Sequence, residues 1–503
     1  MVYKLLNCRT QAFNMRNELT VKNFIEEIES RPDAQIMLRS GYEIPKVFFN
    51  HIHKTGGGTL KRVLQQFYAD PEVLTLSSVF IPQHELNDPN HPLFSARYDV
   101  FNEFFEKAER NGVRFLDTHQ NFHAHIDKSW TCISFVRPPR GRLRSNLNAI
   151  FDPVHLGVSE DFERDTQLLK DGCIEVFLRR TDPFAIQVQQ RCLNLMSREF
   201  LRDHFLRESD RGFYAFLIAR AESDWLERIP IDRFYNMISK RADRFEIIGQ
   251  TLEFDKYLAA ACFTLGIPFQ KEVRSVHVRS DSTKAVAEQI VSNINESLLN
   301  EFTYRDEITY KEFSRRSNEI KDCASAQMEI DLDHASAKEL ESSVNSSFLK
   351  KFRSHLDSSR CSPLQSFILK PSSAFLGWGL GTRRTNPKSP IAFFRMEVGA
   401  TGGFFVHARL SPETKLYLIG PKSDLAKSNV PDATIIVNGV YCEFVECLPH
   451  AIKDVEMQVM CAVFKISAAP PQAESDIQKI EIQTLHREGF FRFHSLAWDS
   501  TAI

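Results

Sequence analysis

Apolar positions in residues 41–320 alternate between short continuous runs and helical stripes. The run VFFNHI at 47–52 has the length of a buried strand and leads directly into three consecutive glycines. Beyond them, Leu60, Leu64 and Phe67 share one face at helical spacing. The pattern predicts a strand, a glycine loop and an amphipathic helix, in that order.

A second unit of the same kind follows. The apolar run TCISFV at 131–136 leads into Arg137-Pro138-Pro139, and a helix with Leu143 and Leu147 on one face comes next. Proline suits the first turn of a helix. Buried strands alternating with helices predict an α/β domain, a P-loop-like parallel sheet flanked by helices.

The remaining segments differ in texture, and we expect four parts in the chain. Residues 1–40 read as an N-terminal helical arm, 41–324 as the α/β domain, and 325–362 as a polar linker that is partly helical. Residues 363–503 contain short alternating strands, one of them (433–440) running into an Asn-Gly turn. This last part predicts an all-β domain, a sandwich or jelly roll.

Composition narrows the function classes. The 503 residues carry a net charge of −2, so nothing global indicates nucleic acid or an anionic membrane, and an anion site would have to arise from local clustering. No apolar stretch reaches the roughly 18 residues of a membrane span. The ten cysteines form no CxxC pair, which argues against zinc and favours thiols in a reducing compartment. We expect a cytoplasmic protein and leave its oligomeric state open.

The glycine loop is the first candidate site. Backbone N–H groups at a helix N-terminus and the helix dipole together attract anions, and glycines let the backbone approach a phosphate closely. Lys54 precedes the glycines, whereas the G-x-x-x-x-G-K-[ST] loop of nucleotide hydrolases has its lysine after them. A tight glycine turn beside an exposed lysine is the structural alternative.

The second candidate is the segment VRPPRGRLR, which holds four arginines and no acid. Arg137 directly follows a strand, and ligands of open α/β sheets bind at the carboxyl ends of strands. The guanidinium fork suits phosphate oxygens. A solvated basic helix face is the alternative. Two such loops would suit a ligand with two separated anionic groups.

Taken together, the motifs resemble the Golgi-type carbohydrate sulfotransferase superfamily, which uses 3′-phosphoadenosine 5′-phosphosulfate (PAPS). HIHKTGGGT at 51–59 is similar to its H-I-P-K-T-G-G-T-[ST] motif, and Arg137 to Ser145 to its R-[DN]-P-x-x-R-x-x-S motif. QVQQRCL at 187–193 and FEIIGQTLEFDKYL at 245–258 resemble two further family segments. The likeness covers about residues 41–320. His53 and Gly58 depart from the pattern.

The resemblance implies a role for each matching residue. The 5′-phosphosulfate would be held by Lys54, Thr55, Gly56, Gly57, Gly58 and Thr59. The 3′-phosphate would be held by Arg137 and Ser145. Lys54 would also stabilise the charge that develops on the leaving oxygen. The resemblance to uronyl 2-O-sulfotransferases implies His119 as general base, with Glu85 as the weaker alternative. Weaker candidates for acceptor contacts are His51, His53, His123 and Arg191. No metal site is expected.

The sequence thus predicts a PAPS-dependent sulfotransferase that modifies a hydroxyl of a glycan or glycolipid and releases 3′,5′-adenosine bisphosphate. Two alternatives stay open: a nucleotide-dependent kinase that uses the same loops, and an inactive nucleotide- or glycan-binding protein. The C-terminal domain resembles modules appended to glycan-modifying enzymes. Trp378 could stack on a sugar there, although packing is the commoner role of such a residue.

Overall fold

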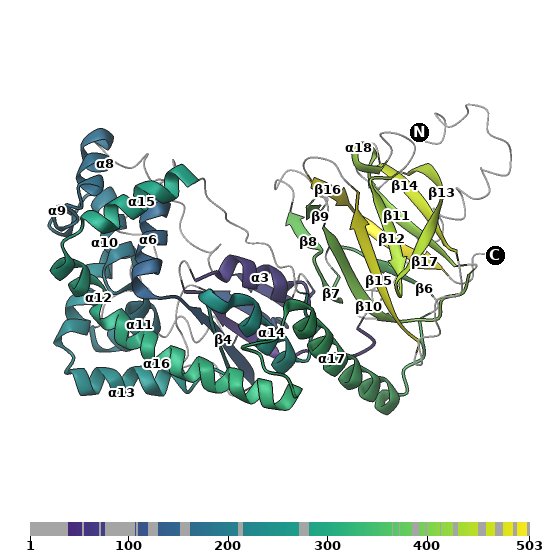
Figure 1. Cartoon of the computed structure of the whole chain (residues 1–503), viewed down its shortest axis with the longest axis horizontal. Helices are drawn as coiled ribbons and strands as arrows, with labels where there is room; N and C mark the ends of the chain where they lie inside the picture. The colour runs from purple at the N-terminus through teal and green to yellow at the C-terminus, as the bar shows by residue number, and fades with distance from the viewer. Residues whose placement is uncertain are drawn as a thin grey trace.

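The structure of the chain is a computed structural model (Figure 1). It describes residues 39–52, 55–69, 72–75, 106, 109–118, 129–150, 161–209, 215–270, 281–364, 366–371, 373–384, 392–397, 400–412, 414–425, 431–450, 459–467, 476–485 and 490–499. Residues 1–38, which make up nearly all of the expected N-terminal arm, lie outside the described residues. The described chain forms a helical α/β half and a β-rich half.

A five-stranded parallel sheet lies at the centre of the first half. Its strands are β1 (Lys46–Asn50), β2 (Val73–Thr75), β3 (Phe115–Thr118), β4 (Trp130–Val136) and β5 (Ile247–Gln250). Their order across the sheet is β2-β3-β1-β4-β5, and all pairs are parallel. The order reverses direction between β1 and β4, which makes this pair of strands the topological switch point.

Helices cover both faces of the sheet. The helices of this half are α3 (Gly57–Gln65), α6 (Pro139–Ile150), α8 (Phe162–Lys170), α9 (Glu175–Leu178), α10 (Pro183–Cys192), α11 (Leu195–Ser209), α12 (Ala215–Arg228), α13 (Ile231–Ala242), α14 (Phe254–Leu265), α15 (Asp281–Asn293), α16 (Glu296–Met328) and α17 (Ala337–Ser359), with a 3₁₀ turn η5 at Thr251–Glu253. Of these, α8, α9, α10 and α15 pack with α6 in a separate apolar cluster. The expected α/β architecture with a parallel sheet is confirmed.

The two faces of β1 show why it reads as a continuous apolar run. Val47 and Phe49 pack with Leu60 of α3 in one core, whereas Phe48 packs with Phe200 of α11 in another. All five side chains are fully buried. Strands buried on both faces need apolar residues at every position, because side chains alternate between the two faces.

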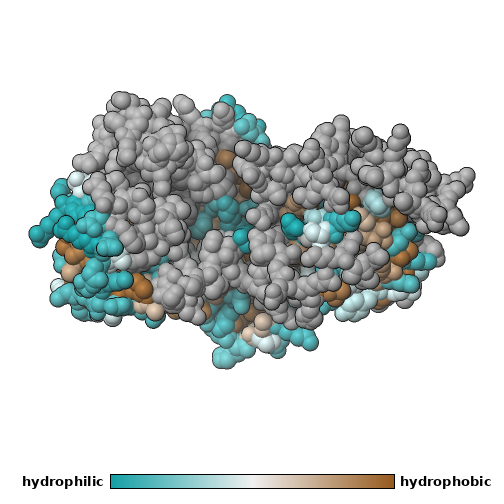
Figure 2. Space-filling model, turned by 90° about the horizontal axis from the view of Figure 1, so that it is seen from above, coloured by the Kyte–Doolittle hydropathy of each residue, from teal (hydrophilic) through white to brown (hydrophobic). Residues whose placement is uncertain are grey.

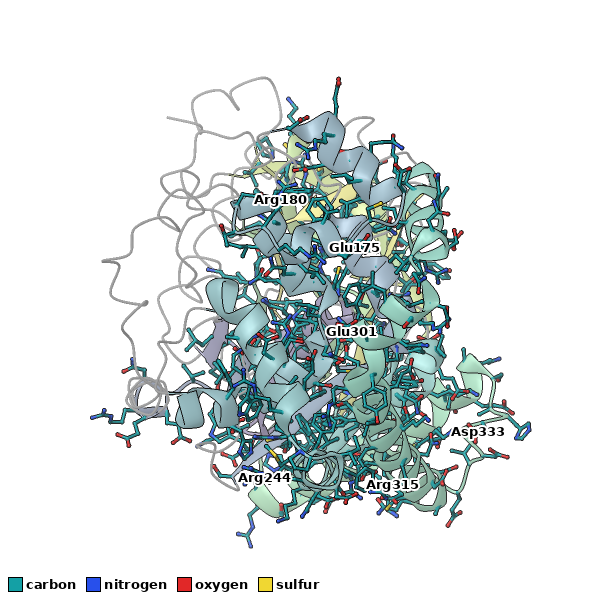
Figure 3. All side chains as sticks on the ribbon, turned by 90° about the vertical axis from the view of Figure 1, so that its left-hand side faces the viewer. Glu175, Arg180, Arg244, Glu301, Arg315 and Asp333 are labelled. Carbon is teal, nitrogen blue, oxygen red and sulfur yellow. The ribbon has the colours of Figure 1, made fainter. Side chains whose placement is uncertain are left out.

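Ion pairs tie the helical layer together. Arg180 contacts the buried Asp165, and Arg315 contacts the buried Glu312. Arg180 and Arg315 are labelled in Figure 3. Inside this half, Glu222 accepts from both Arg198 and Arg202, and all three side chains are buried. Seen from above, hydrophilic side chains gather at this helical end of the molecule (Figure 2).

The segment expected as a polar linker contributes to the core. Residues 325–362 contain the end of α16 and all of α17, which begins at a capping box of Ser336 and Glu339. Along α17 one apolar stripe is buried, and its Phe348 lies against Phe405 of the β-rich half with ring centroids 5.4 Å apart. Helix α17 therefore joins the two halves (Figure 1).

The second half is antiparallel. Its strands are β6 (Ser366–Leu369), β7 (Leu376–Trp378), β8 (Gly381–Arg384), β9 (Ala392–Glu397), β10 (Thr401–His407), β11 (Lys415–Pro421), β12 (Ala433–Val437), β13 (Val440–His450), β14 (Val459–Ile466), β15 (Ile477–Thr484), β16 (Phe490–Phe493) and β17 (Ser495–Asp499), with a short helix α18 (Lys422–Leu425). They form a nine-stranded sheet and a three-stranded sheet that share a main apolar core, and a smaller apolar cluster lies on β6, β11, β14 and β17.

Trp378 packs at the junction of the halves. It is 4% exposed, lies 5.3 Å from the ring of Phe405, and has Lys479 Nζ 5.2 Å above its centroid. Its faces are therefore covered by protein, and the packing role is the one that the structure supports. Among the described helices, none is long and apolar enough to cross a membrane.

Candidate anion-binding site

The loop after β1 turns into α3 as the glycine run predicts. Gly56 is the N-cap of α3 and has φ of 78°, a left-handed conformation that glycine adopts without strain. No side chain caps this helix end, and its first turn contains no acid. The amide end of α3 is thus presented at the carboxyl edge of the sheet, where it favours an anion.

Thr55 and Gly57 each have a structural role in the loop. The Thr55 hydroxyl donates to the Ile52 carbonyl at 2.8 Å and closes the loop on itself, so only its backbone amide and hydroxyl lone pairs remain for a ligand. Gly57 lies under the ring of His51: a Cβ at Gly57 would be 1.9 Å from His51 Cδ2. The ring can occupy this place only because position 57 is glycine.

The arginine segment folds into a second anion-attracting corner. Arg137 follows β4, and its side chain lies along the first turn of α6, with Nε 3.5 Å from the place of a Cβ at Gly141. Ser145 lies one turn further along the same helix face. Burial, and then the charges of Arg144 and Arg142, lower the pKa of Arg137. A guanidinium crowded by like charges stands in a positive field that an anion would relieve.

One cavity of about 330 Å³ joins the two corners. It is lined by Gly56, Thr59, Arg137, Thr251, Leu252, Phe254 and Asp255. The adjacency of β1 and β4 in the sheet brings the first three together, at the switch point where ligands of such sheets bind. Residues 54–59 and Arg137 were singled out from sequence, and the structure places Gly56, Thr59 and Arg137 in one pocket.

The β5–α14 side of the pocket was not predicted. Leu252 is 73% exposed, an apolar surface at the pocket, and Phe254 lies within 3.4 Å of the place of a Cβ at Gly56. Asp255 lies in the first turn of α14, and partial burial raises the pKa of its carboxyl. The segment FEIIGQTLEFDKYL had been singled out from the sequence, but nothing in it says which side chains face a ligand.

A buried carboxylate under the loop was also missed. Asp117 on β3 is 1% exposed; its Oδ1 lies 3.3 Å from His51 Nδ1 and its Oδ2 2.7 Å from Lys61 Nζ. Although burial raises the pKa of Asp117, the pairing with His51 and Lys61 outweighs this effect and the net shift is downward. An acid inside the apolar strand FLDT was the signal that could have revealed it.

Two further arginines, Arg142 and Arg191, do not line this pocket. Arg142 is fully buried and pairs with Asp306, which also accepts from the backbone N–H of Ser197 at 2.8 Å. This arginine of the second motif therefore ties α6 to α16 and to the start of α11. Arg191 on α10 is half-buried, and its carbonyl accepts from Asn146 of α6 at 3.1 Å.

Several predicted residues lie outside the described parts of the chain. These are His53, Lys54, Glu85, His119 and His123. For them the structure gives the flanking positions only: residue 54 directly precedes Thr55, and residue 119 directly follows β3. Their assignments therefore stay predictions.

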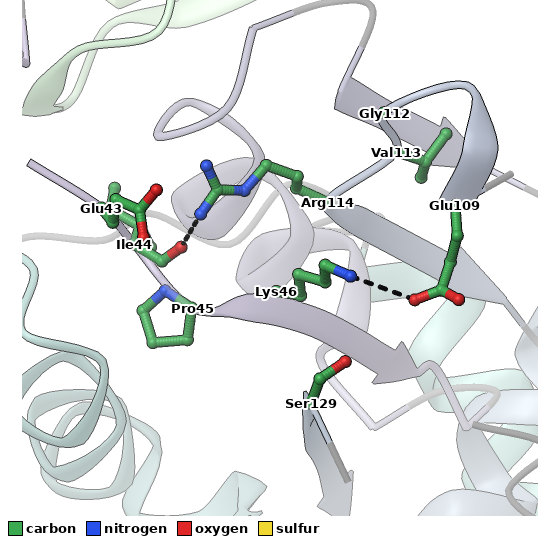
Figure 4. A pocket seen from close by; sticks show the side chains of 9 residues that line it. All are labelled: Glu43, Ile44, Pro45, Lys46, Glu109, Gly112, Val113, Arg114 and Ser129. Carbon is green, nitrogen blue, oxygen red and sulfur yellow. Dashed lines mark hydrogen bonds and ion pairs between the residues drawn. The ribbon is translucent and has the colours of Figure 1, made fainter. Parts of the chain in front are cut away.

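A second cavity, of about 580 Å³, lies at the opposite edge of the sheet, where the strands begin (Figure 4). Two of its charged side chains have partners: Lys46 Nζ lies 3.1 Å from Glu109, and Arg114 donates to the Ile44 carbonyl at 2.5 Å (Figure 4). None of the residues predicted to bind an anion lines it.

The arrangement at the β1/β4 switch point presents two groups that attract anions, the amide end of α3 and Arg137. Within the described residues, no cluster of three or more His, Cys, Asp or Glu side chains is placed to hold a metal ion. A scan of protein-family models finds no match to the chain, and a search of curated proteins finds none either.

Proposed function

We propose that the chain is a PAPS-dependent sulfotransferase that transfers a sulfuryl group to a hydroxyl of a glycan or glycolipid. The observation that carries the proposal is the single pocket that joins Gly56 and Thr59 of the first motif to Arg137 of the second. Two anion-attracting corners on adjacent strands suit a nucleotide with phosphate groups at both its 3′ and 5′ positions.

The residues present fit this cofactor. The uncapped amide end of α3 and the preceding Lys54 would hold the 5′-phosphosulfate, and Arg137 with Ser145 would hold the 3′-phosphate. Leu252 offers an apolar surface for the purine. When bound, PAPS supplies an activated sulfuryl group on a phosphate leaving group. The strand order 2-3-1-4-5 is compatible with the P-loop-like fold that the resemblance implies.

The chemistry asks two things of the protein. His119, directly after β3, would accept the proton of the acceptor hydroxyl as its oxygen attacks sulfur. Lys54 and the amide end of α3 would stabilise the negative charge that grows on the departing phosphate oxygen. The products are a sulfate ester, 3′,5′-adenosine bisphosphate and a proton on the base.

Transfer of labelled sulfate from PAPS to glycans extracted from the source organism tests the proposal. Lys54→Ala and His119→Ala each remove one proposed role, and we expect a loss of at least about a hundredfold in rate from each. Full transfer by Lys54→Ala would refute the leaving-group role. Phosphoryl transfer from ATP in place of sulfuryl transfer would favour the kinase alternative.

A further inference from the structure

Asp117 is a charged residue in an otherwise apolar strand. In the sheet it is the register partner of Phe49, so both side chains lie on the face that α3 covers. The carboxylate is 1% exposed, and a buried charge is costly unless it is paired. A feature this costly in the middle of a core needs an explanation that the fold alone does not give.

The partners of Asp117 belong to the two elements that flank the glycine loop. His51 directly follows β1, and Lys61 lies one helical turn after Gly57 on α3. The carboxylate therefore contacts one residue before the glycine loop and one residue after it. An anion bound at the amide end of α3 would lie next to the loop that His51 and Lys61 flank.

The ring of His51 has a fixed orientation. It stacks on Phe49, with centroids 5.2 Å apart and planes 17° from parallel. Its Nδ1 edge faces Asp117, and its opposite edge, Cδ2 and Nε2, faces the backbone of Gly57 at the first turn of α3. Among the described groups, Asp117 from β3 and Lys61 from α3 are the charges beside it.

We infer that Asp117 is a positioning residue that makes His51 a hydrogen-bond donor to the anion bound at the start of α3. The inference rests on the proposed function only for the identity of that anion. The Asp117 carboxylate lies 3.3 Å from Nδ1 and would favour a proton on that nitrogen, which leaves Nε2 turned toward the anion. With the anion in place, the ring lies between two negative groups, the anion and the Asp117 carboxylate, which Lys61 contacts on its other oxygen. The imidazolium is then favoured over the neutral ring, and binding takes up a proton.

The test uses the full chain and two matched variants. Asp117→Asn removes the charge beneath the loop, whereas Asp203→Asn removes an equally buried carboxylate, 1% exposed and held by Arg241 at 2.6 Å, far along the chain. Calorimetry with 3′,5′-adenosine bisphosphate, between about pH 6 and pH 8 and in buffers of different ionisation enthalpy, gives affinity and proton uptake together.

The wild type should bind more tightly at the lower pH and take up protons. Asp117→Asn should lose about tenfold or more in affinity and most of the proton uptake. Asp203→Asn, if folded, should keep both. An Asp117→Asn protein with the affinity and pH dependence of the wild type would overturn the inference, as would an equal loss in Asp203→Asn.

Two further measurements keep the inference testable on its own. His51→Gln should lose the proton uptake as well, and it serves if Asp117→Asn does not fold. Nitrogen-15 spectra of the ligand-free wild type at about pH 8, assigned with His51→Gln, should show neutral His51 with its proton on Nδ1. A proton on Nε2 would overturn the inference. Failure of the wild type to bind the bisphosphate, with the Nδ1 proton present, would refute only the proposed cofactor.

Discussion

Gly57→Ala tests the geometry of the loop most simply, because two physical effects oppose each other there. A Cβ at Gly57 would lie 1.9 Å from His51 Cδ2, whereas carbon atoms in contact are about 3.5–4.0 Å apart. The ring of His51 must move to make room, and its contact with the Asp117 carboxylate is then broken. Helix propensity alone would predict that Gly57→Ala stabilises the protein, since alanine is the better helix former.

The magnitudes decide the sign. Overpacking a filled site costs about 1–3 kcal/mol. Moving the ring away leaves the buried Asp117 carboxylate less well compensated, which costs about 1.5–3 kcal/mol. The gain in helix propensity is at most about 1 kcal/mol. We therefore expect Gly57→Ala to lower the free energy of unfolding by about 2–5 kcal/mol.

Gly141→Ala is the matched control in the first turn of the other helix. The nearest atom to its Cβ is Arg137 Nε at 3.5 Å, an ordinary contact, so this variant should be unchanged or up to about 1 kcal/mol more stable. Urea unfolding followed by tryptophan fluorescence compares the two. A Gly57→Ala protein as stable as the wild type would show that His51 does not lie over the loop.

Three other outcomes follow from the structure. The pairing lowers the pKa of Asp117, so the carboxylate stabilises the fold fully above its unfolded pKa near 4, and this stabilisation is lost as the pH falls through the lower folded pKa. In acid titrations of stability, the difference in unfolding free energy between the wild type and Asp117→Asn should therefore narrow below about pH 4. Arg137→Ala should weaken binding of 3′,5′-adenosine bisphosphate about tenfold to a hundredfold by calorimetry, whereas Arg140→Ala, an exposed arginine paired with Glu296, should leave it unchanged. Trp378→Ala should destabilise the chain by about 3–5 kcal/mol in urea unfolding, and an undiminished midpoint would contradict its packing role at the junction.

The sequence predicted local units well. The run at 47–52 and the glycines correspond to β1 and the start of α3, and the run at 131–136 corresponds to β4. These features depend on neighbouring residues, through apolar periodicity and the conformational freedom of glycine in the loop.

Contacts between segments that are distant in the chain could not be predicted from the sequence. Nothing local shows that Asp117 would find Lys61 and His51, because these three meet only once β1 and β3 pair and α3 packs on them. The polar composition of 325–362 likewise hid the single apolar stripe that makes α17 the junction between the halves. Both depend on tertiary packing, which periodicity over one element does not specify.

The central claim is that the β1/β4 pocket holds a nucleotide with phosphates at both the 3′ and 5′ positions. Calorimetric titration of the full chain with 3′,5′-adenosine bisphosphate, ADP and ATP tests it without any knowledge of the acceptor. The account predicts that the bisphosphate binds more tightly than ADP or ATP, and that Arg137→Ala removes most of this preference. Tighter binding of ATP than of the bisphosphate would contradict it.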